Sequence, residues 1–131
     1  MSAPRVVLGV AGASGAALGL SVARQLSEMN VEIDLVTSTA AERTLAEECG
    51  PDAFETLKEL ATRVHPLGDI GASIASGSVP VAGMIVAPCS MRSLAAIAHG
   101  MDDNLLTRAA GVQLKERRRL ILLTQLTTAW H

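Results

Sequence analysis

The chain has 131 residues and a formal net charge of −2, which fits one domain and excludes the strongly basic composition of nucleic-acid-binding domains. Hydrophobic residues make up 49% of it but aromatic residues only 2%, so small aliphatic side chains must build the core, and the apolar surplus suits an oligomer. Glycines interrupt the apolar N-terminal stretch, which therefore predicts neither a secretory signal nor a membrane span. With two cysteines and no metal-ligand spacing, we expect one cytoplasmic domain over residues 1–131, without metal, membrane or nucleic acid.

The first half of the chain alternates between strand and helix patterns. Residues 5–11 form an apolar run that predicts a buried strand, and residues 14–29 have the spacing of a helix. A second strand is predicted over residues 31–37. Two further helices are predicted over residues 40–48 and 53–63, separated by a Gly-Pro pair that cannot continue a helix.

The second half repeats this alternation after a Gly/Ser-rich stretch at residues 66–80. A third strand is predicted over residues 81–87, helices over 91–98 and 104–115, and a fourth strand over 120–124. Strands that alternate with helices predict an α/β fold, here a Rossmann-like (flavodoxin-like) doubly wound parallel sheet with three α/β/α layers. In such a sheet, ligands bind at the carboxyl ends of the strands.

The first strand ends in the turn Gly12-Ala13-Ser14-Gly15. Glycines there let the backbone approach a phosphate or a ring, and the helix that follows offers free amides. The turn matches neither a phosphate loop nor a strict G-x-G-x-x-G fingerprint, so a tight strand-to-helix connection is an equal interpretation of this segment alone.

Hydroxyl side chains follow the next two strands. Ser38 lies where dinucleotide-binding folds carry an acidic residue, which favours a phosphate or flavin edge over a ribose; a plain helix cap is the alternative. The third strand end offers Ser90 and Ser93 at the same edge of the sheet. Cys89 could be a nucleophile, but no histidine pairs with it, and a half-buried thiol is the commoner case. Asn104 precedes a helix and suits its cap.

Several motifs together carry a resemblance to a known family. They are Gly12-Ala13-Ser14-Gly15, Ser38 before Ala40-Ala41, ASIASGS at 72–78, Pro88-Cys89-Ser90, DNLLTRAA at 103–110 and LKERR at 114–118. This combination resembles the flavin prenyltransferases, the UbiX/Pad1 group formerly described as aromatic-acid decarboxylases. The resemblance extends to about Leu123.

The resemblance implies a flavoprotein that transfers a dimethylallyl group from dimethylallyl phosphate to N5 and C6 of reduced FMN. The product, prenylated FMN, would serve a UbiD-type decarboxylase, and the assembly would be a homododecamer without metal. The implied FMN contacts are Gly12, Ala13, Ser14, Ser38, Ser90, Met91, Arg92 and Ser93. The implied residues on the prenyl side are Ala87, Pro88 and Cys89. Ser14 and Glu48 become candidates for proton transfer. The alternative is that both are structural, Ser14 as a residue at a helix start and Glu48 as an exposed acid on a helix.

The sequence departs from the family after Leu123. It reads TQLTTAWH at 124–131, and Gln125 stands where the family has a phosphate-binding arginine, so the C-terminus looks shortened or frame-shifted. An FMN-binding or oligomer-forming module without transferase chemistry is therefore the second hypothesis. A flavin-dependent cysteine decarboxylase ranks third, because that group has a Pro-Ala-Ser-Ala-Asn-Thr turn and this chain has PCSMRS at 88–93.

Overall fold

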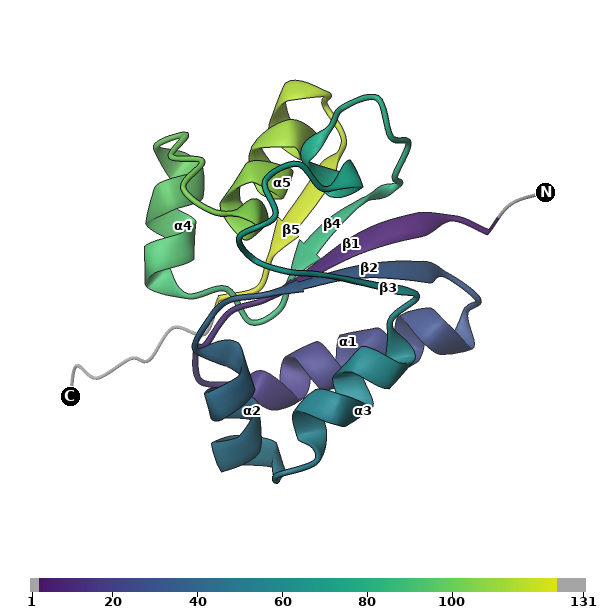
Figure 1. Cartoon of the computed structure of the whole chain (residues 1–131), viewed down its shortest axis with the longest axis vertical. Coiled ribbons are helices and arrows are strands. Elements are labelled where there is room, and N and C mark those ends of the chain that lie inside the picture. Colours follow the sequence, from purple (N-terminus) through teal and green to yellow (C-terminus); the bar gives the residue numbers. More distant parts are fainter. Residues whose placement is uncertain (1–2, 125–131) are drawn as a thin grey trace.

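A parallel sheet with the strand order β3-β2-β1-β4-β5 forms the centre of the computed structural model, which describes residues 3–124 (Figure 1). The strands are β1 (Arg5–Val10), β2 (Glu32–Thr37), β3 (Arg63–His65), β4 (Gly83–Val86) and β5 (Arg119–Leu122). Each adjacent pair is parallel. This order is that of a Rossmann-like doubly wound sheet, as the alternation of strands and helices predicted.

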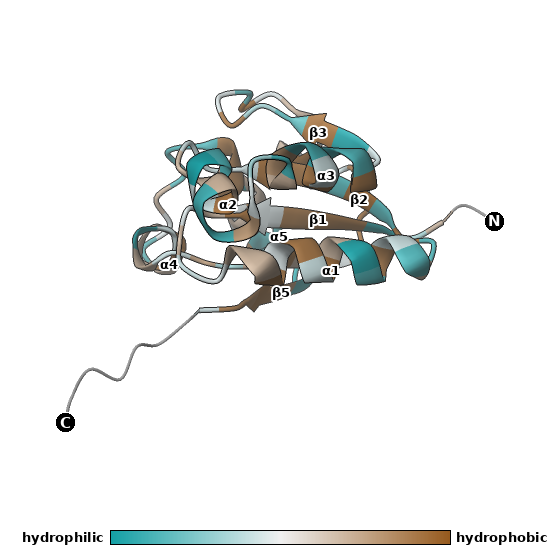
Figure 2. Cartoon of the chain, turned by 90° about the horizontal axis from the view of Figure 1, so that it is seen from below, coloured by the Kyte–Doolittle hydropathy of each residue, from teal (hydrophilic) through white to brown (hydrophobic). Residues whose placement is uncertain are grey.

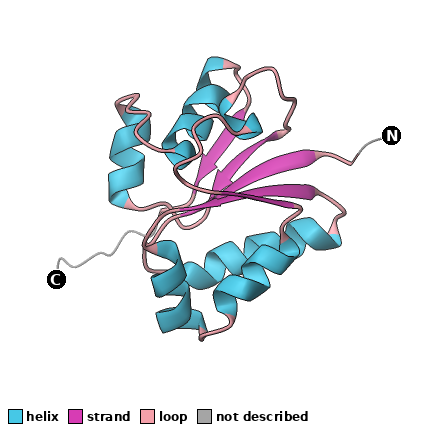
Figure 3. Ribbon diagram, viewed as in Figure 1, coloured by secondary structure: helices cyan, strands magenta, loops and turns pink. Residues whose placement is uncertain are grey.

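Helices cover both faces of the sheet, which gives the predicted three layers (Figure 3). The helices are α1 (Ala16–Glu28), α2 (Ala41–Cys49), α3 (Ala53–Leu60), α4 (Met91–Ala98) and α5 (Leu105–Lys115), with a short 3₁₀ helix, η1 (Ser73–Ala75). The first three pack on one face around Leu8, Leu35 and Leu57, and α4 and α5 pack on the other around Met84 and Leu106. Figure 2 looks onto the face covered by α1, α2 and α3 and shows the hydrophobic colour of β1 in the gap between α1 and α3. Within residues 3–124, no helix is long and apolar enough to cross a bilayer.

The edge strand β3 corrects the sequence prediction, which gave four strands and a helix over residues 53–63. Helix α3 ends at Leu60, and Arg63–His65 pairs with β2 instead. The three residues of this strand are too few to show an alternating pattern. Their pairing is stabilised by Asp34, whose buried carboxylate accepts hydrogen bonds from Arg63 Nε at 2.7 Å and Arg5 Nε at 3.1 Å.

Glycines set how closely α1 approaches the sheet. Gly15 has a φ of 95°, a left-handed conformation that starts the helix at Ala16, two residues later than predicted. A Cβ atom on Gly19 would lie 2.6 Å from the carbonyl oxygen of Ala87. Helix α1 therefore packs directly on the end of β4. The turn at residues 12–15, here called the first turn, lies beside the residues that follow β4.

Candidate flavin site

The ends of β1 and β2 are joined by a hydrogen bond. The Gly12 amide donates to Ser38 Oγ at 2.9 Å, and the Ser38 amide donates to the Val10 carbonyl at 2.9 Å. A Cβ atom on Gly12 would lie 2.4 Å from Cβ of Ala40, so this turn has room only for glycine. The interpretation of Ser38 as a side-chain cap of α2 is wrong, because that helix has no side-chain cap and the Ser38 hydroxyl binds Gly12 instead.

A hollow of about 440 Å³, here called the polar pocket, lies at this edge of the sheet. Its lining residues are Gly12, Ser38, Thr39, Ala40, Leu67, Ser90, Arg92, Ser93, Asn104 and Leu106. Five of these are among the FMN contacts that the family resemblance implies: Gly12, Ser38, Ser90, Arg92 and Ser93. The fold thus brings together residues from the ends of β1, β2 and β4.

Three helix N-termini converge on the polar pocket. Helix α2 starts beside Ala40, α4 starts at its cap Ser90, and α5 starts at its cap Asn104. Each N-terminus carries a partial positive charge and points backbone N–H groups outward. Arg92 is the one charged side chain among the lining residues. The pocket therefore has the electrostatics of an anion site.

The pocket hydroxyls are held in place by the helix caps. Ser90 Oγ accepts a hydrogen bond from the Ser93 amide at 3.1 Å and donates one to Ser93 Oγ at 3.0 Å. At α5, Asn104 Oδ1 accepts from the Thr107 amide at 2.9 Å, and Thr107 Oγ1 accepts from the Asn104 amide at 3.2 Å. Asn104 is therefore the predicted cap and also a lining residue, which the sequence analysis missed. The fixed caps keep the mouth of the pocket rigid.

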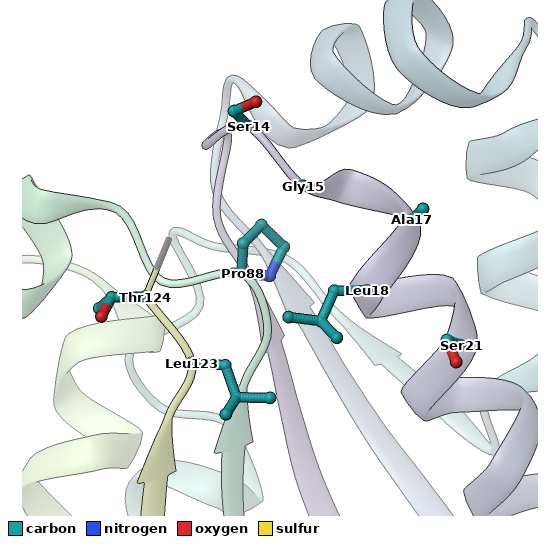
Figure 4. Close-up of a pocket in the computed structure, with 8 residues that line it drawn as sticks. All are labelled: Ser14, Gly15, Ala17, Leu18, Ser21, Pro88, Leu123 and Thr124. Carbon is teal, nitrogen blue, oxygen red and sulfur yellow. The ribbon is translucent and has the colours of Figure 1, made fainter. Parts of the chain in front are cut away.

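A second hollow of about 470 Å³, here called the apolar cleft, lies beyond the turn at residues 12–15 (Figure 4). Its lining residues are Ser14, Gly15, Ala17, Leu18, Ser21, Pro88, Leu123 and Thr124. Leu18 projects from α1 towards Pro88 and Leu123. The two hollows have no lining residue in common, but each is lined in part by the segments that follow β1 and β4.

Glu48 reaches the first turn from the end of α2. Its Oε1 accepts hydrogen bonds from the amides of Gly15 and Ala16, each at 3.0 Å. These two bonds, from Ala16 first and Gly15 second, lower the pKa of the Glu48 carboxyl below its usual range, and the Ser14 hydroxyl adds to the effect. Glu48 is therefore not just an exposed acid on the surface of α2. It caps the N-terminus of α1 and lies beside Ser14.

The other predicted residues take different places. Ala87 and Cys89 are buried, and burial raises the pKa of the Cys89 thiol, which disfavours a thiolate nucleophile. Pro88 lines the apolar cleft, whereas Ala13 and Met91 line neither hollow. In the described part of the chain, no group of three or more His, Cys, Asp or Glu residues could hold a metal. Of the C-terminal departure, only Thr124 is described, and Gln125 with the residues after it lies outside the described part of the chain.

The leucines that line the two hollows were not found from the sequence. Leu67 lines the polar pocket from the Gly/Ser-rich stretch, where its carbonyl accepts a hydrogen bond from the Leu105 amide at 2.9 Å. Leu18 and Leu123 have the pattern of core residues, and only the packing shows that they face the cleft. The hydrogen bond to α5 gives no local sequence signal, because its partners are far apart in the chain.

Known proteins match this chain in sequence and in fold. The family model described as Flavoprotein matches residues 1–130. The flavin prenyltransferase UbiX of Thauera aromatica is 51% identical over 123 residues, which cover 94% of this chain and 63% of that protein. UbiX of Neisseria meningitidis serogroup B is likewise 51% identical and is covered to 65%. The chain thus spans less than two thirds of the length of these curated relatives.

Solved structures give the same result. The crystal structure of AnUbiX (PadA1) in complex with FMN and dimethylallyl pyrophosphate is 42% identical with a TM-score of 0.92, over 99% of this chain and 69% of that one. A dodecameric FMN-dependent UbiX-like decarboxylase from Escherichia coli O157:H7 is 42% identical with a TM-score of 0.91, over 96% of this chain and 68% of that one. The FMN-dependent cysteine decarboxylase TvaF, at 18% identity and a TM-score of 0.72, shares the fold alone.

Proposed function

Since this chain belongs to the flavoprotein family and groups there with the UbiX-type flavin prenyltransferases, we propose that it binds FMN and transfers a dimethylallyl group from dimethylallyl phosphate to the reduced flavin. The observation that carries the proposal is the polar pocket, where three helix N-termini and Arg92 surround the Gly12–Ser38 hydrogen bond. An apolar cleft adjoins it. A phosphate next to an apolar space is the chemistry of both FMN and a prenyl phosphate.

The residues present fit FMN. The phosphate of FMN would lie beside Gly12, which leaves room for it, and would be bound by the Ser38 hydroxyl and the N-termini of α4 and α5, where the helix dipoles favour an anion. The flavin ring would then extend past Ser14 and Pro88 towards the apolar cleft. When bound and reduced, FMN supplies the electron-rich ring atoms N5 and C6 that receive the prenyl carbons.

The chain's own groups would bind the second substrate and exclude water from it. Leu18, Pro88 and Leu123 offer an apolar surface for the five-carbon prenyl group. Departure of phosphate from an allylic carbon leaves positive charge on that carbon, and a carboxylate nearby stabilises such charge. The amides of Ala16 and Gly15 lower the pKa of Glu48, so the carboxylate stays negatively charged but is a weaker base than a free glutamate. Its role would therefore be charge stabilisation first, with acceptance of a proton, through Ser14, as a weaker second role.

The proposal extends to the surroundings of the enzyme. The E. coli O157:H7 relative is described as dodecameric, which supports a homo-oligomer for this chain as well. Prenylated FMN would pass to a UbiD-type decarboxylase, and the site of action would be the cytoplasm.

A second candidate function is FMN binding without transfer. It is favoured by the polar pocket, whose helix N-termini and Arg92 account for binding of the FMN phosphate without any group that takes part in prenyl transfer. Anaerobic incubation with reduced FMN and dimethylallyl phosphate, followed by mass analysis of the extracted flavin, separates the two. One added prenyl unit supports transfer. Retained, unmodified FMN supports the second candidate and rejects transferase activity for this chain.

A further inference from the structure

Arg92 is the charged side chain at the mouth of the polar pocket, yet burial does not hold it there. It lies in the first turn of α4, and 66% of its side chain is exposed. A long, exposed arginine side chain populates many rotamers and loses entropy when it is fixed. Something else must keep its guanidinium group at the pocket.

Asp103 supplies that restraint from the loop between α4 and α5. Its Oδ2 accepts a hydrogen bond from Arg92 Nη2, and its Oδ1 accepts one from Thr107 Oγ1 at 3.2 Å. Thr107 is 1% exposed and belongs to the capping box with Asn104, so it is a rigid anchor. Asp103 therefore connects the exposed guanidinium group of Arg92 on α4 to the start of α5.

The charges agree with this geometry. The hydrogen bond from Arg92, first, and the one from Thr107 lower the pKa of the Asp103 carboxyl, so Asp103 is ionised at neutral pH. Its bond to Arg92 uses one N–H group of the guanidinium, which has five donors in a planar fork. Within residues 3–124 the remaining donors make no hydrogen bond, which leaves them in this arrangement to bind a second anion.

We propose that Asp103 is a positioning residue, which holds Arg92 at the polar pocket and thereby makes the pocket prefer a flavin that carries a phosphate. Asp103 is not among the residues that line the pocket, so it acts through Arg92. The inference rests on the proposed function only as far as flavin binding. It does not depend on prenyl transfer.

The test is a pair of equilibrium titrations, one with FMN and one with riboflavin, which lacks the phosphate. Both are followed by quenching of flavin fluorescence. In Asp103→Asn, we expect the Kd for FMN to rise roughly five-fold, as for loss of one exposed but well-anchored ion pair, while the Kd for riboflavin stays within about two-fold. Arg92→Gln should weaken FMN binding at least as much. The double variant should bind FMN no more weakly than Arg92→Gln alone.

Glu47→Gln is the matched control, because it removes another carboxylate from a surface ion pair, the one with Arg43 on α2. It should leave both Kd values unchanged. Tighter FMN binding by Asp103→Asn would overturn the proposal and make Asp103 a competitor for Arg92. Equal weakening of both flavins, no change in either, or an Asp103→Asn effect that persists without Arg92 would also overturn it. If the wild-type protein binds neither flavin, the proposed function itself fails.

Discussion

The amide of Gly12 and the hydroxyl of Ser38 lie 2.9 Å apart and join the carboxyl ends of two neighbouring strands. The Ser38 hydroxyl is thus already bound on one side by the protein. Its own proton remains available to a ligand in the polar pocket, because a hydroxyl can accept and donate at once. A single side chain therefore shapes the turn at residues 12–15 and lines the polar pocket.

Replacement of Ser38 by Ala should weaken FMN binding and destabilise the fold. The Gly12 amide would lose its partner, and an intramolecular hydrogen bond contributes about 1 kcal/mol to the free energy of unfolding. Fluorescence titration and chemical denaturation measure the two effects. Ser27→Ala, an exposed serine on α1, should change neither the Kd for FMN nor the fold noticeably.

Gly12→Ala should be more damaging than its size suggests. The new methyl group would lie 2.4 Å from Cβ of Ala40, so the first turn and the start of α2 must move apart. Overpacking of this kind costs about 1–3 kcal/mol of unfolding free energy. Flavin binding should fall at least ten-fold with it. Gly68→Ala is the matched control, since a Cβ there meets nothing within 4 Å. Equal behaviour of the two variants would contradict the crowding argument.

Asp34 should make stability depend on pH in the acid range. Arg63 and Arg5, with His65, lower its pKa from 3.8 to about 2, against the opposing effect of burial. A carboxyl with a lowered folded-state pKa stabilises the fold fully above its unfolded pKa, and the contribution disappears as pH falls through the folded value. At pH 7 it amounts to about 2 kcal/mol.

Denaturation of the wild-type protein and Asp34→Asn between pH 7 and pH 2 checks this. The difference in unfolding free energy should be largest at neutral pH and should shrink from about pH 4 downwards. Glu59→Gln, which alters an exposed acid on α3, should follow the wild-type curve. A difference that stays constant with pH would show that the loss comes from packing and not from the charge.

Leu18→Asp should impair binding of the prenyl substrate without impairing binding of FMN. A carboxylate in the apolar cleft would repel the phosphate ester and remove apolar contact from the prenyl group. We expect the KM for dimethylallyl phosphate to rise about ten-fold, while the Kd for FMN changes little. Val64→Asp introduces the same charge on the exposed edge strand β3 and serves as the control. A large loss of FMN affinity in Leu18→Asp would contradict the division of roles.

The sequence predicted the sheet well because each strand and helix has its own periodicity. It failed at β3, where three residues are too short for a pattern and the pairing depends on Asp34, 29 residues from Arg63 along the chain. Part of the site was predictable because of where its residues stand relative to the strands. Gly12, Ser38 and Ser90 each follow a strand, and parallel strands bring their carboxyl ends together.

The long-range contacts around the site were not predictable in this way. Glu48 caps α1 from 33 residues away, and Asp103 binds Arg92 across the loop between α4 and α5. Such contacts depend on how helices pack, and neither propensity nor spacing encodes them locally. Leu67 is similar, since it reaches the polar pocket from a stretch without a pattern.

We propose that the polar pocket binds the phosphate of FMN. Titration of the wild-type protein with FMN and with riboflavin, at matched ionic strength, distinguishes this from binding through the flavin ring alone. We predict saturable FMN binding with a Kd of about 1 μM and at least a ten-fold weaker Kd for riboflavin, because only FMN carries the dianion that the three helix N-termini favour. Equal affinity for the two flavins, or no saturable binding of FMN, would contradict the assignment.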